Sequence, residues 1–458
     1  MTGYRPDSKI LELGADFYDV VEAARFPQAI PRFLNQRWAG HVGLALDDAE
    51  WEAHFCRFEP LPGNLTRPLA LRYHGHQFRV YNPGIGDGRG FLFAQLRDDG
   101  SRLLDLGTKG SGQTPYSRHA DGRLTLKGGV REVLATEMLE ALWVNTSKSF
   151  ALFETGEALE RGDEPSPTRS AVLTRLSHGH IRIGTFQRLA FLGDTGNIAK
   201  LTRYCLEQLY GERPSGDDKE NALRLFDLVT RATATLAASY LAAGFVHGVL
   251  NSDNINVTGE SFDYGPWRFT PEWDPEFTAA YFDHRGLYAF DRQPEAIRWD
   301  LAQFGGCLSM VAGIPPLYEV LAGWNEPFES ALIEALLQRL GIAGGDSDRE
   351  IAVALIAALE SRDATIDRIF FDWRGGRDPG PDRYPSEPFR ALAKSLEGRE
   401  RAKSHPYWSD AEPCSMHIDE VEAIWSAIAE RDDWQPFNDK VTAIRRMGEA
   451  IRVDASEA

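Results

Sequence analysis

Apolar and polar positions follow two different periods in the first third of the chain. Residues 69–74, 90–97 and 102–108 are short apolar or alternating runs separated by glycine and aspartate, which predicts β-strands. The turn at 97–100, with the sequence RDDG, predicts a hairpin between two of them. Over 129–143 the apolar residues recur at helical spacing instead. This part therefore predicts a small sheet followed by one helix.

The remainder of the chain is predicted to be mainly helical. Residues 150–205 are interpreted as further strands and connections, whereas 217–243 carries apolar residues on one face and predicts a long helix. Four more helices are predicted at 296–322, 328–341, 419–431 and 439–453. Strands gathered in one part and helices in another are typical of an α+β protein.

Composition restricts the class of protein. The 458 residues contain 43% hydrophobic and 26% charged side chains, as expected for a globular enzyme with a large core. A net charge of −18 argues against nucleic acid as a main partner. The four cysteines are far apart and form no CxxC pair, so neither a zinc knuckle nor a disulfide framework is predicted.

No segment of the sequence predicts insertion into a membrane. No apolar run approaches about 18 residues, the length that a membrane-spanning helix needs. The first residues, 1–19, carry several acidic side chains, which disfavours a signal or transit peptide. The expected location is therefore the cytoplasm, a reducing compartment in which free cysteines are usual.

The strongest chemical motif is HGVLNSDN at 247–254, followed by DYG at 263–265. It resembles the H-x-D-x-x-x-x-N and D-F-G motifs of protein-kinase-like phosphotransferases. His247 and Asn254 keep the kinase spacing, but Val249 replaces the catalytic aspartate. The chain is therefore either a dead kinase that still binds nucleotide or an enzyme that performs different chemistry with ATP.

Asn254 and Asp263 remain suited to holding a metal ion. An amide oxygen and a carboxylate, completed by phosphate oxygens and water, are ligands for Mg²⁺ or Mn²⁺. Asp253 lies beside Asn254 and is the best candidate for a general base now that position 249 is valine. The alternative is that Asp253 only orders the loop. His247 is expected to be structural.

Lys109 and Glu132 form a second candidate pair. Lys109 ends a predicted strand and Glu132 lies on the following predicted helix, an arrangement that directs a lysine towards ATP phosphates. Taken alone, the two residues would be interpreted as surface charges. Gly86 and Gly88 precede the strand at 90–97 and would let backbone N–H groups approach phosphates, although a glycine-rich hairpin turn explains them equally well.

Other polar residues could extend a nucleotide site. Arg175 and Arg182 would neutralise a polyphosphate, although each alone would be interpreted as a surface cation. Asp121 and Gly122 belong to a polar loop that fits phosphate or ribose contacts, and the alternative is a solvated turn.

Together these motifs resemble the selenoprotein O family, also called the YdiU family, of pseudokinase-fold protein adenylyltransferases. The resemblance extends from about residue 70 to residue 310. Besides 247–254, it is carried by YHGHQF at 73–78, GDGRG at 86–90, KGSGQTPYSR at 109–118, DGR at 121–123, RE at 131–132, FDYGP at 262–266 and FDRQP at 290–294.

The resemblance implies that ATP binds inverted relative to kinases and that AMP passes to Ser, Thr or Tyr hydroxyls of protein substrates, with Mg²⁺ or Mn²⁺. The enzyme itself is one candidate substrate. The alternatives are uridylyl transfer, an atypical kinase, and a non-catalytic nucleotide-binding scaffold. Asp253 would be the proton acceptor, Asn254 and Asp263 the metal ligands, and Glu132 the partner of Lys109. The implied nucleotide contacts are Gly86, Gly88, Arg89, Lys109, Asp121, Gly122, Arg175, Arg182 and Asp263.

The expected architecture is an α+β, protein-kinase-like two-lobed fold with an extension at each end. We expect the small lobe at 66–170 and the large lobe at 171–400. The N-terminal extension is expected at 1–65 and a C-terminal helical extension at 401–458.

Two positions depart from the family pattern. Members commonly carry a cysteine near the position of Ala279 and a cysteine or selenocysteine at the C-terminus, whereas this sequence ends in DASEA. We therefore expect no redox control through these positions.

Overall fold

The structure, a computed structural model, describes residues 3–162, 164–399 and 405–456. Its first part contains an eight-stranded sheet of order β1-β3-β6-β7-β10-β9-β2, with β8 paired to β10 and every pairing antiparallel. The strands are β1 (Tyr18–Val20), β2 (Ile30–Leu34), β3 (Leu69–Leu71), β6 (Leu92–Arg97), β7 (Leu103–Lys109), β8 (Leu124–Thr125), β9 (Lys148–Leu159) and β10 (Thr168–Ser177). The α+β class is thereby confirmed.

The strands predicted at 69–74, 90–97 and 102–108 are β3, β6 and β7, and the predicted hairpin joins β6 to β7. The predicted helix is α3 (Leu126–Ala141), which begins three residues earlier than expected because Thr125 caps it by accepting the N–H of Gly128. A separate hairpin, β4 (Gly75–Gln77) and β5 (Val80–Asn82), follows β3.

Strand β7 is buried on both faces, and this directs its last residue. Leu103 belongs to a core cluster shared with α3, whereas Leu104 and Leu106 belong to a second cluster with α2 (Asp48–Phe55). Because side chains alternate along a strand, Lys109 shares the face of Leu103 and points towards α3.

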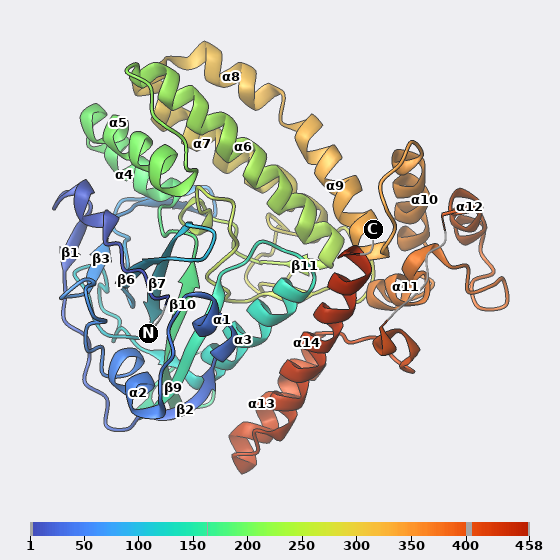
Figure 1. The fold of residues 1–458 in the computed structure, drawn as a ribbon, viewed down its shortest axis with the longest axis horizontal. Helices are drawn as coiled ribbons and strands as arrows, with labels where there is room; N and C mark the ends of the chain where they lie inside the picture. The colour runs from blue at the N-terminus through green and yellow to red at the C-terminus, as the bar shows by residue number, and fades with distance from the viewer. Residues whose placement is uncertain (1–2, 163, 400–404, 457–458) are drawn as a thin grey trace.

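The first residues of the chain complete the sheet. β1 pairs with β3 at one edge, and β2 pairs with β9 at the other. Helix α1 (Gln36–His41) follows β2, and Asn35 caps it. Figure 1 shows these blue segments wrapped around the sheet.

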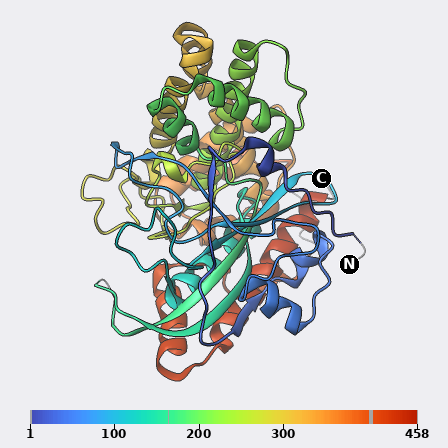
Figure 2. The ribbon, with the colours of Figure 1, turned by 90° about the vertical axis from the view of Figure 1, so that its left-hand side faces the viewer.

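The second part is helical, as predicted, and Figure 2 shows most of it in the half of the molecule above the sheet. The long helix α6 packs on α7 and α9. The helices are α4 (Ile183–Phe191), α5 (Thr195–Tyr204), α6 (Asp218–Ala243), α7 (Gln293–Ala312), α8 (Ile314–Ala322), α9 (Asn325–Leu340), α10 (Asp348–Glu360), α11 (Ile366–Asp372) and α12 (Glu387–Ser395). Gly244, with φ of +68°, ends α6 in the left-handed conformation that favours glycine. The short strand β11 (Phe245–Val246), paired with β12 (Arg268–Phe269), then leads into the segment 247–254.

Two predictions about helices were wrong. Residues 150–205 contain not only β9 and β10 but also α4 and α5, whose apolar residues join the main core. These helices have only nine and ten residues, and their short apolar stretches were interpreted as parts of strands and connections. The single helix predicted at 296–322 is two helices, because Gly313 adopts a φ of +78° that an α-helix excludes. Helices α10 and α11 were not predicted.

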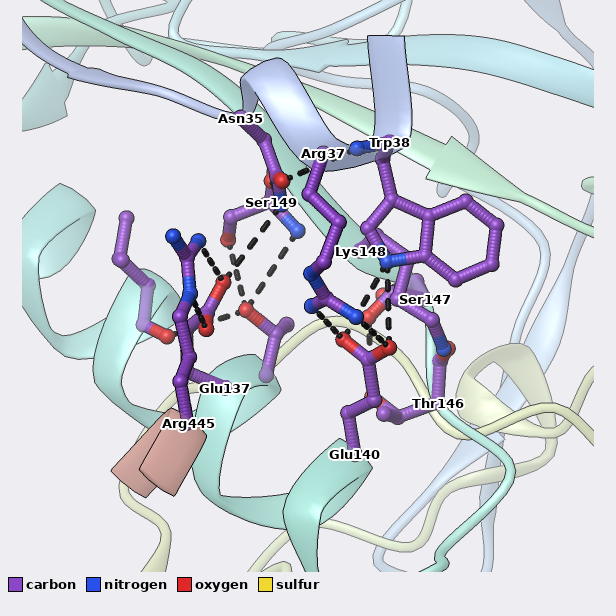
Figure 3. Close-up of polar contacts among 12 residues, drawn as sticks. Asn35, Arg37, Trp38, Glu137, Glu140, Thr146, Ser147, Lys148, Ser149 and Arg445 are labelled. Carbon is purple, nitrogen blue, oxygen red and sulfur yellow. Dashed lines mark hydrogen bonds and ion pairs between the residues drawn. The ribbon is translucent and has the colours of Figure 1, made fainter. Parts of the chain in front are cut away.

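The terminal helices are α13 (Ile418–Arg431) and α14 (Gln435–Ser456), and α14 begins before the predicted 439–453. α14 packs along α3, as Figure 1 shows. Arg445 of α14 donates two hydrogen bonds, of 2.7 and 2.9 Å, to the buried Glu137 of α3 (Figure 3). Arg37 of α1 likewise donates two bonds of 2.7 Å to Glu140 (Figure 3). Both ends of the chain therefore hold α3.

The predicted C-terminal extension begins within 400–404, which lies outside the described residues. No helix in the ranges that the structure describes is long and apolar enough to cross a membrane.

Candidate active site

A cavity of about 310 Å³ brings together most of the residues singled out in the sequence. It lies where β7 and β10 meet the segment 247–265. The predicted site residues that line it are Gly86, Gly88, Arg89, Lys109, Arg175, Arg182, Asp253 and Asp263.

Lys109 is buried between two carboxylates. Its Nζ forms an ion pair with Glu132 of α3 and a second one, of 2.7 Å, with Oδ1 of Asp263. Glu132 is fully buried and lies behind the lysine rather than in the cavity wall. The strand lysine and the helix glutamate of the sequence are therefore in direct contact.

Asp263 occupies an unusual position in both conformation and charge. Its φ is +63°, a left-handed conformation that costs free energy for any residue with a Cβ, and such residues are frequent at functional sites. Arg175 lies 3.2 Å from Oδ1. Burial opposes ionisation, but Lys109, Arg175 and Arg182 outweigh it and hold the pKa of Asp263 well below its usual value. The carboxylate is therefore charged.

Arg182 links the glycine-rich segment to the segment 247–254. One guanidinium nitrogen donates to the backbone oxygen of Asp253 at 3.0 Å, and the other lies 3.2 Å from Oδ1 of Asp87. The guanidinium also stacks over Tyr73, 4.3 Å from the ring centroid. These contacts fix a buried cation at the cavity wall.

Asp253 lies in the single helical turn Ser252–Asn254 and is 7% exposed. Within the described part of the chain, its Oδ1 has no hydrogen-bond partner. Burial raises the pKa of Asp253 to about 6, although Arg182 acts in the opposite direction. A side chain at Gly75 would place its Cβ 2.8 Å from that of Asp253, so this glycine leaves room for the carboxylate. A buried carboxyl with a free oxygen that faces a cavity can accept a proton.

Asn254 does not line the cavity, but its side chain is oriented. Its Nδ2 donates to the backbone oxygen of Val249 at 2.9 Å, which leaves Oδ1 as the atom able to bind a cation. No cluster of three or more His, Cys, Asp or Glu side chains suited to a metal occurs in the described ranges. An amide oxygen and the Asp263 carboxylate are hard ligands, and they fit a divalent ion that keeps phosphate oxygens and water in its shell. His247 is buried, and its Nε2 lies 3.0 Å from the backbone oxygen of Phe262.

Asp121 and Gly122 also lie outside the cavity lining. Asp121 forms an ion pair of 2.9 Å with Arg161, and the oxygen of Gly122 accepts the N–H of Gly112. Gly122 has φ of +70°, and a Cβ there would lie 2.3 Å from the backbone of Gly112. The structure thus gives both residues a role in holding their loop.

Some cavity residues were not identified as site residues from the sequence. Asp87 pairs with Arg182, and its Oδ2 accepts the N–H of Leu71 at 3.0 Å. Its position between two glycines is a signal that could have been used. The other lining residues are Tyr73, Gln77, Ile85, Gly90, Thr108, Tyr116, Ser117, Arg118 and Ala120. Five cationic side chains thus line a cavity in a chain whose net charge is −18. Such a cavity, next to an amide and a carboxylate oxygen, is chemically suited to phosphate groups and a divalent ion.

Comparison with known proteins agrees with such a site. A family model described as protein adenylyltransferase SelO matches residues 3–379. A protein nucleotidyltransferase YdiU from Synechocystis sp. is 41% identical, over 94% of this chain and 96% of its own length. Proteins of that name from Gloeobacter violaceus and Trichodesmium erythraeum are 43% and 40% identical, over 95% of this chain and 93% and 97% of their own lengths. The chain belongs to the SelO/YdiU family of protein nucleotidyltransferases, which confirms the resemblance seen in the sequence.

Proposed function

We propose that this enzyme transfers AMP from ATP to serine, threonine or tyrosine hydroxyls of proteins, with Mg²⁺ or Mn²⁺, and releases pyrophosphate. One observation carries the proposal. The buried carboxyl of Asp253 faces the same cavity as five cationic side chains, while the position at which a kinase has its base is Val249. The cations can hold the β- and γ-phosphates, which leaves the α-phosphorus as the electrophile near Asp253. The names of the relatives agree with nucleotidyl transfer to proteins.

In the proposed reaction Asp253 accepts the proton of the acceptor hydroxyl, and the hydroxyl oxygen forms a bond to the α-phosphorus. The bond from the α-phosphorus to the oxygen that bridges to the β-phosphate breaks, and pyrophosphate leaves with the electron pair. Lys109, Arg175 and Arg182 stabilise the negative charge on that leaving group. Asn254 and Asp263 would hold a divalent ion, which would act as a Lewis acid on the phosphate oxygens.

The remaining candidates have supporting roles in this proposal. Glu132 holds Lys109 in place, as their buried ion pair indicates. Gly86 and Gly88 line the cavity and let the backbone approach the nucleotide. A Cβ at either position would also meet Tyr116. Arg89, exposed at the cavity wall, contacts phosphate. Asp121 and Gly122, which lie outside the cavity lining, would contact the nucleotide only through their loop.

We also propose that the fold is that of a two-lobed protein kinase, with the lobes at 66–170 and 171–400 and the extensions at 1–65 and 401–458. A strand lysine paired with a glutamate on a single helix supports this proposal. The placement of the segment 247–254 directly after the long helix α6 and β11 also supports it.

The deciding experiment compares label transfer from α-labelled and γ-labelled ATP to protein, first with Mg²⁺ and then with Mn²⁺. We expect protein to be labelled from the α position alone. Label from the γ position would identify an atypical kinase. ATP binding without transfer would identify a scaffold, and preferential transfer from α-labelled UTP would replace AMP by UMP.

A further inference from the structure

Three aromatic side chains in ring contact, together with the exposed Val80 of the same hairpin, lie on segments next to the candidate active site, and we name these four residues the aromatic rim. Phe78 and Val80 come from the hairpin β4–β5, and Tyr281 and Phe282 come from the loop 279–288. Tyr281 is 78% exposed, Val80 70% and Phe282 41%, although the large apolar residues of this protein are mostly buried. Phe78 joins the two segments, because its ring centroid lies 5.7 Å from that of Phe282.

The aromatic rim is attached to the segment that carries Asp253. Oδ1 of Asn251 accepts the backbone N–H of Phe78 at 2.9 Å and the hydroxyl of Tyr288 at 2.7 Å. One side chain, two residues before Asp253, therefore holds both the hairpin and the loop. The hairpin also reaches the site directly, because Gln77 lines the cavity. The two segments that carry the rim are thus tied to the segment of Asp253, and the hairpin also contributes to the cavity wall.

The hairpin holds its exposed tip at a cost in conformational free energy. Phe78 and Arg79 have φ of +49° and +62°. A two-residue hairpin turn with both central φ values positive normally contains Asn and Gly, since a Cβ is unfavourable there. Strain of this kind persists where the position of the side chains matters.

The loop is held equally firmly. The carboxylate of Asp283 accepts the N–H groups of Leu287 and Tyr288, both at 2.8 Å. The guanidinium of Arg292 donates to the backbone oxygen of Arg285 at 3.2 Å. Tyr281 and Phe282 are therefore presented to solvent by an ordered loop rather than left exposed by a loose one.

The surroundings of the rim carry a positive charge balance in an acidic protein. Arg79 pairs with Glu295 at 3.1 Å, and Arg285 and Arg292 add two exposed guanidinium groups. Three cations at the rim, against the two carboxylates Glu295 and the buried Asp283, contrast with the net charge of −18 for the whole chain. Such a surface complements a peptide segment that is apolar and acidic.

We propose that the aromatic rim docks the acceptor protein, and that it selects an extended segment with a large apolar residue and an acidic residue beside the acceptor hydroxyl. This inference rests on the proposed function, because it assigns the substrate segment of the same site. Apolar contact with Tyr281 and Phe282 supplies affinity, and Arg285 supplies the preference for acid. The hydrogen bonds of Asn251 to the hairpin and the loop fix the rim relative to Asp253, so that the acceptor hydroxyl of a docked segment lies next to this carboxyl.

The experiment measures kcat/KM for transfer from α-labelled ATP to synthetic peptides with one central threonine. In the first peptide the threonine has phenylalanine and glutamate as neighbours, in the second phenylalanine and lysine, and in the third only serine. The variants are Tyr281→Ser with Phe282→Ser, and separately Arg285→Glu. The matched control is Ile314→Ser with Tyr318→Ser, which removes two side chains of α8, each 69% exposed, that line a different groove.

We expect the wild type to prefer the apolar, acidic peptide. In the Tyr281 and Phe282 double variant, kcat/KM should fall about tenfold for both phenylalanine peptides and change little for the serine peptide. Arg285→Glu should reverse the preference between glutamate and lysine. The control should keep wild-type kcat/KM, and every variant should keep the stabilisation by ATP.

Equal kcat/KM for the three peptides, or rim variants that behave like the control, would overturn the docking surface. Wild-type enzyme that labels itself from α-labelled ATP but labels no peptide would overturn it as well. Absence of α-label from every acceptor, the enzyme included, would instead refute the proposed function on which the inference rests.

Discussion

At the scale of single residues, the proposed chemistry depends on Asp253. Its carboxyl is buried, faces the cavity and has an oxygen without a hydrogen-bond partner among the described residues. The cations that can hold phosphate, such as Lys109 and Arg175, are anchored by other carboxylates. Removal of Asp253 should therefore affect proton transfer and leave nucleotide binding in place.

We expect Asp253→Asn to lower the rate of AMP transfer at least about a hundredfold, because amide nitrogen and oxygen cannot take up the hydroxyl proton. Stabilisation by ATP in thermal unfolding should remain. Asp105→Asn is the control, since Asp105 is a buried carboxylate of β7 outside the cavity lining. Wild-type transfer rates in the Asp253 variant would remove the base assignment.

Glu260 provides a prediction about pH and stability. It is buried and accepts the N–H of His178 at 2.7 Å, and burial raises its pKa from 4.5 to about 7. The pKa of Glu260 is higher in the folded than in the unfolded chain. Its protonated form therefore contributes fully to the unfolding free energy below the unfolded pKa, and this contribution is lost as pH rises through the folded pKa.

Glu260→Gln keeps the acceptor oxygen and removes the titration. From about pH 5 to about pH 8 the wild type should therefore lose about 2 kcal/mol of unfolding free energy relative to this variant. Denaturant unfolding at each pH measures the difference. A difference independent of pH would show that Glu260 titrates alike in the folded and unfolded chain.

The residues of the candidate site were predictable at this scale where they belong to a recognisable motif, whereas the contacts between distant residues were not. Asn254 and Asp263 could be paired because their spacing follows a known motif. Asp87 was missed, because its partner Arg182 lies 95 positions away and only folding brings them to 3.2 Å. The roles of these residues stay predictions until the variants are measured.

At the scale of elements, helix α3 connects the site to both ends of the chain. It carries Glu132 towards the cavity and Glu137 and Glu140 towards α14 and α1 (Figure 3). Each glutamate is held by a cation of a different segment. The position of Lys109 therefore depends on contacts made far from the cavity.

We expect Arg445→Met to destabilise the protein by about 2 kcal/mol, because it leaves the buried Glu137 without its cation. The value is at the low end for a buried pair, since Arg445 is itself 33% exposed and partly screened. The double variant Arg445→Met with Glu137→Gln should recover most of the loss. Denaturant unfolding of the wild type, the two single variants and the double variant gives the coupling free energy between Arg445 and Glu137. Strictly additive effects of the two substitutions would show that this ion pair does not contribute to stability.

The elements themselves were predictable where their hydrophobic period is long. The strands at β6 and β7 and the helix α6 follow directly from the sequence pattern. The short α4 and α5 were not predicted, because each has at most ten residues and such short helices depend on packing on the main core for their stability.

At the scale of the whole molecule, the first residues are part of the sheet. β1 and β2 form its two edges, and Phe17 and Phe33 are buried in the main core. A folded body without these residues would expose the edges of β3 and β9 and a large apolar surface.

We expect a chain that begins at Asn35 to be insoluble or to lose cooperative unfolding. The control is Leu11→Ser, because Leu11 lies in the removed segment and is 49% exposed. The solubility and the sharpness of the thermal unfolding transition are measured for the truncated chain and for the control. A soluble, cooperatively folded truncation with normal ATP binding would show that the edges are dispensable.

The sequence by itself determined the family, the α+β class and the short-range parts of the site, because motif spacing and hydrophobic period are local properties of a chain. Tertiary structure alone decided that Lys109, Arg175 and Arg182 converge on Asp263 and Asp253, and that both chain ends hold α3. It also placed the hairpin β4–β5 beside the loop 279–288. These contacts join residues far apart in sequence, and their energies depend on burial, which no local pattern records.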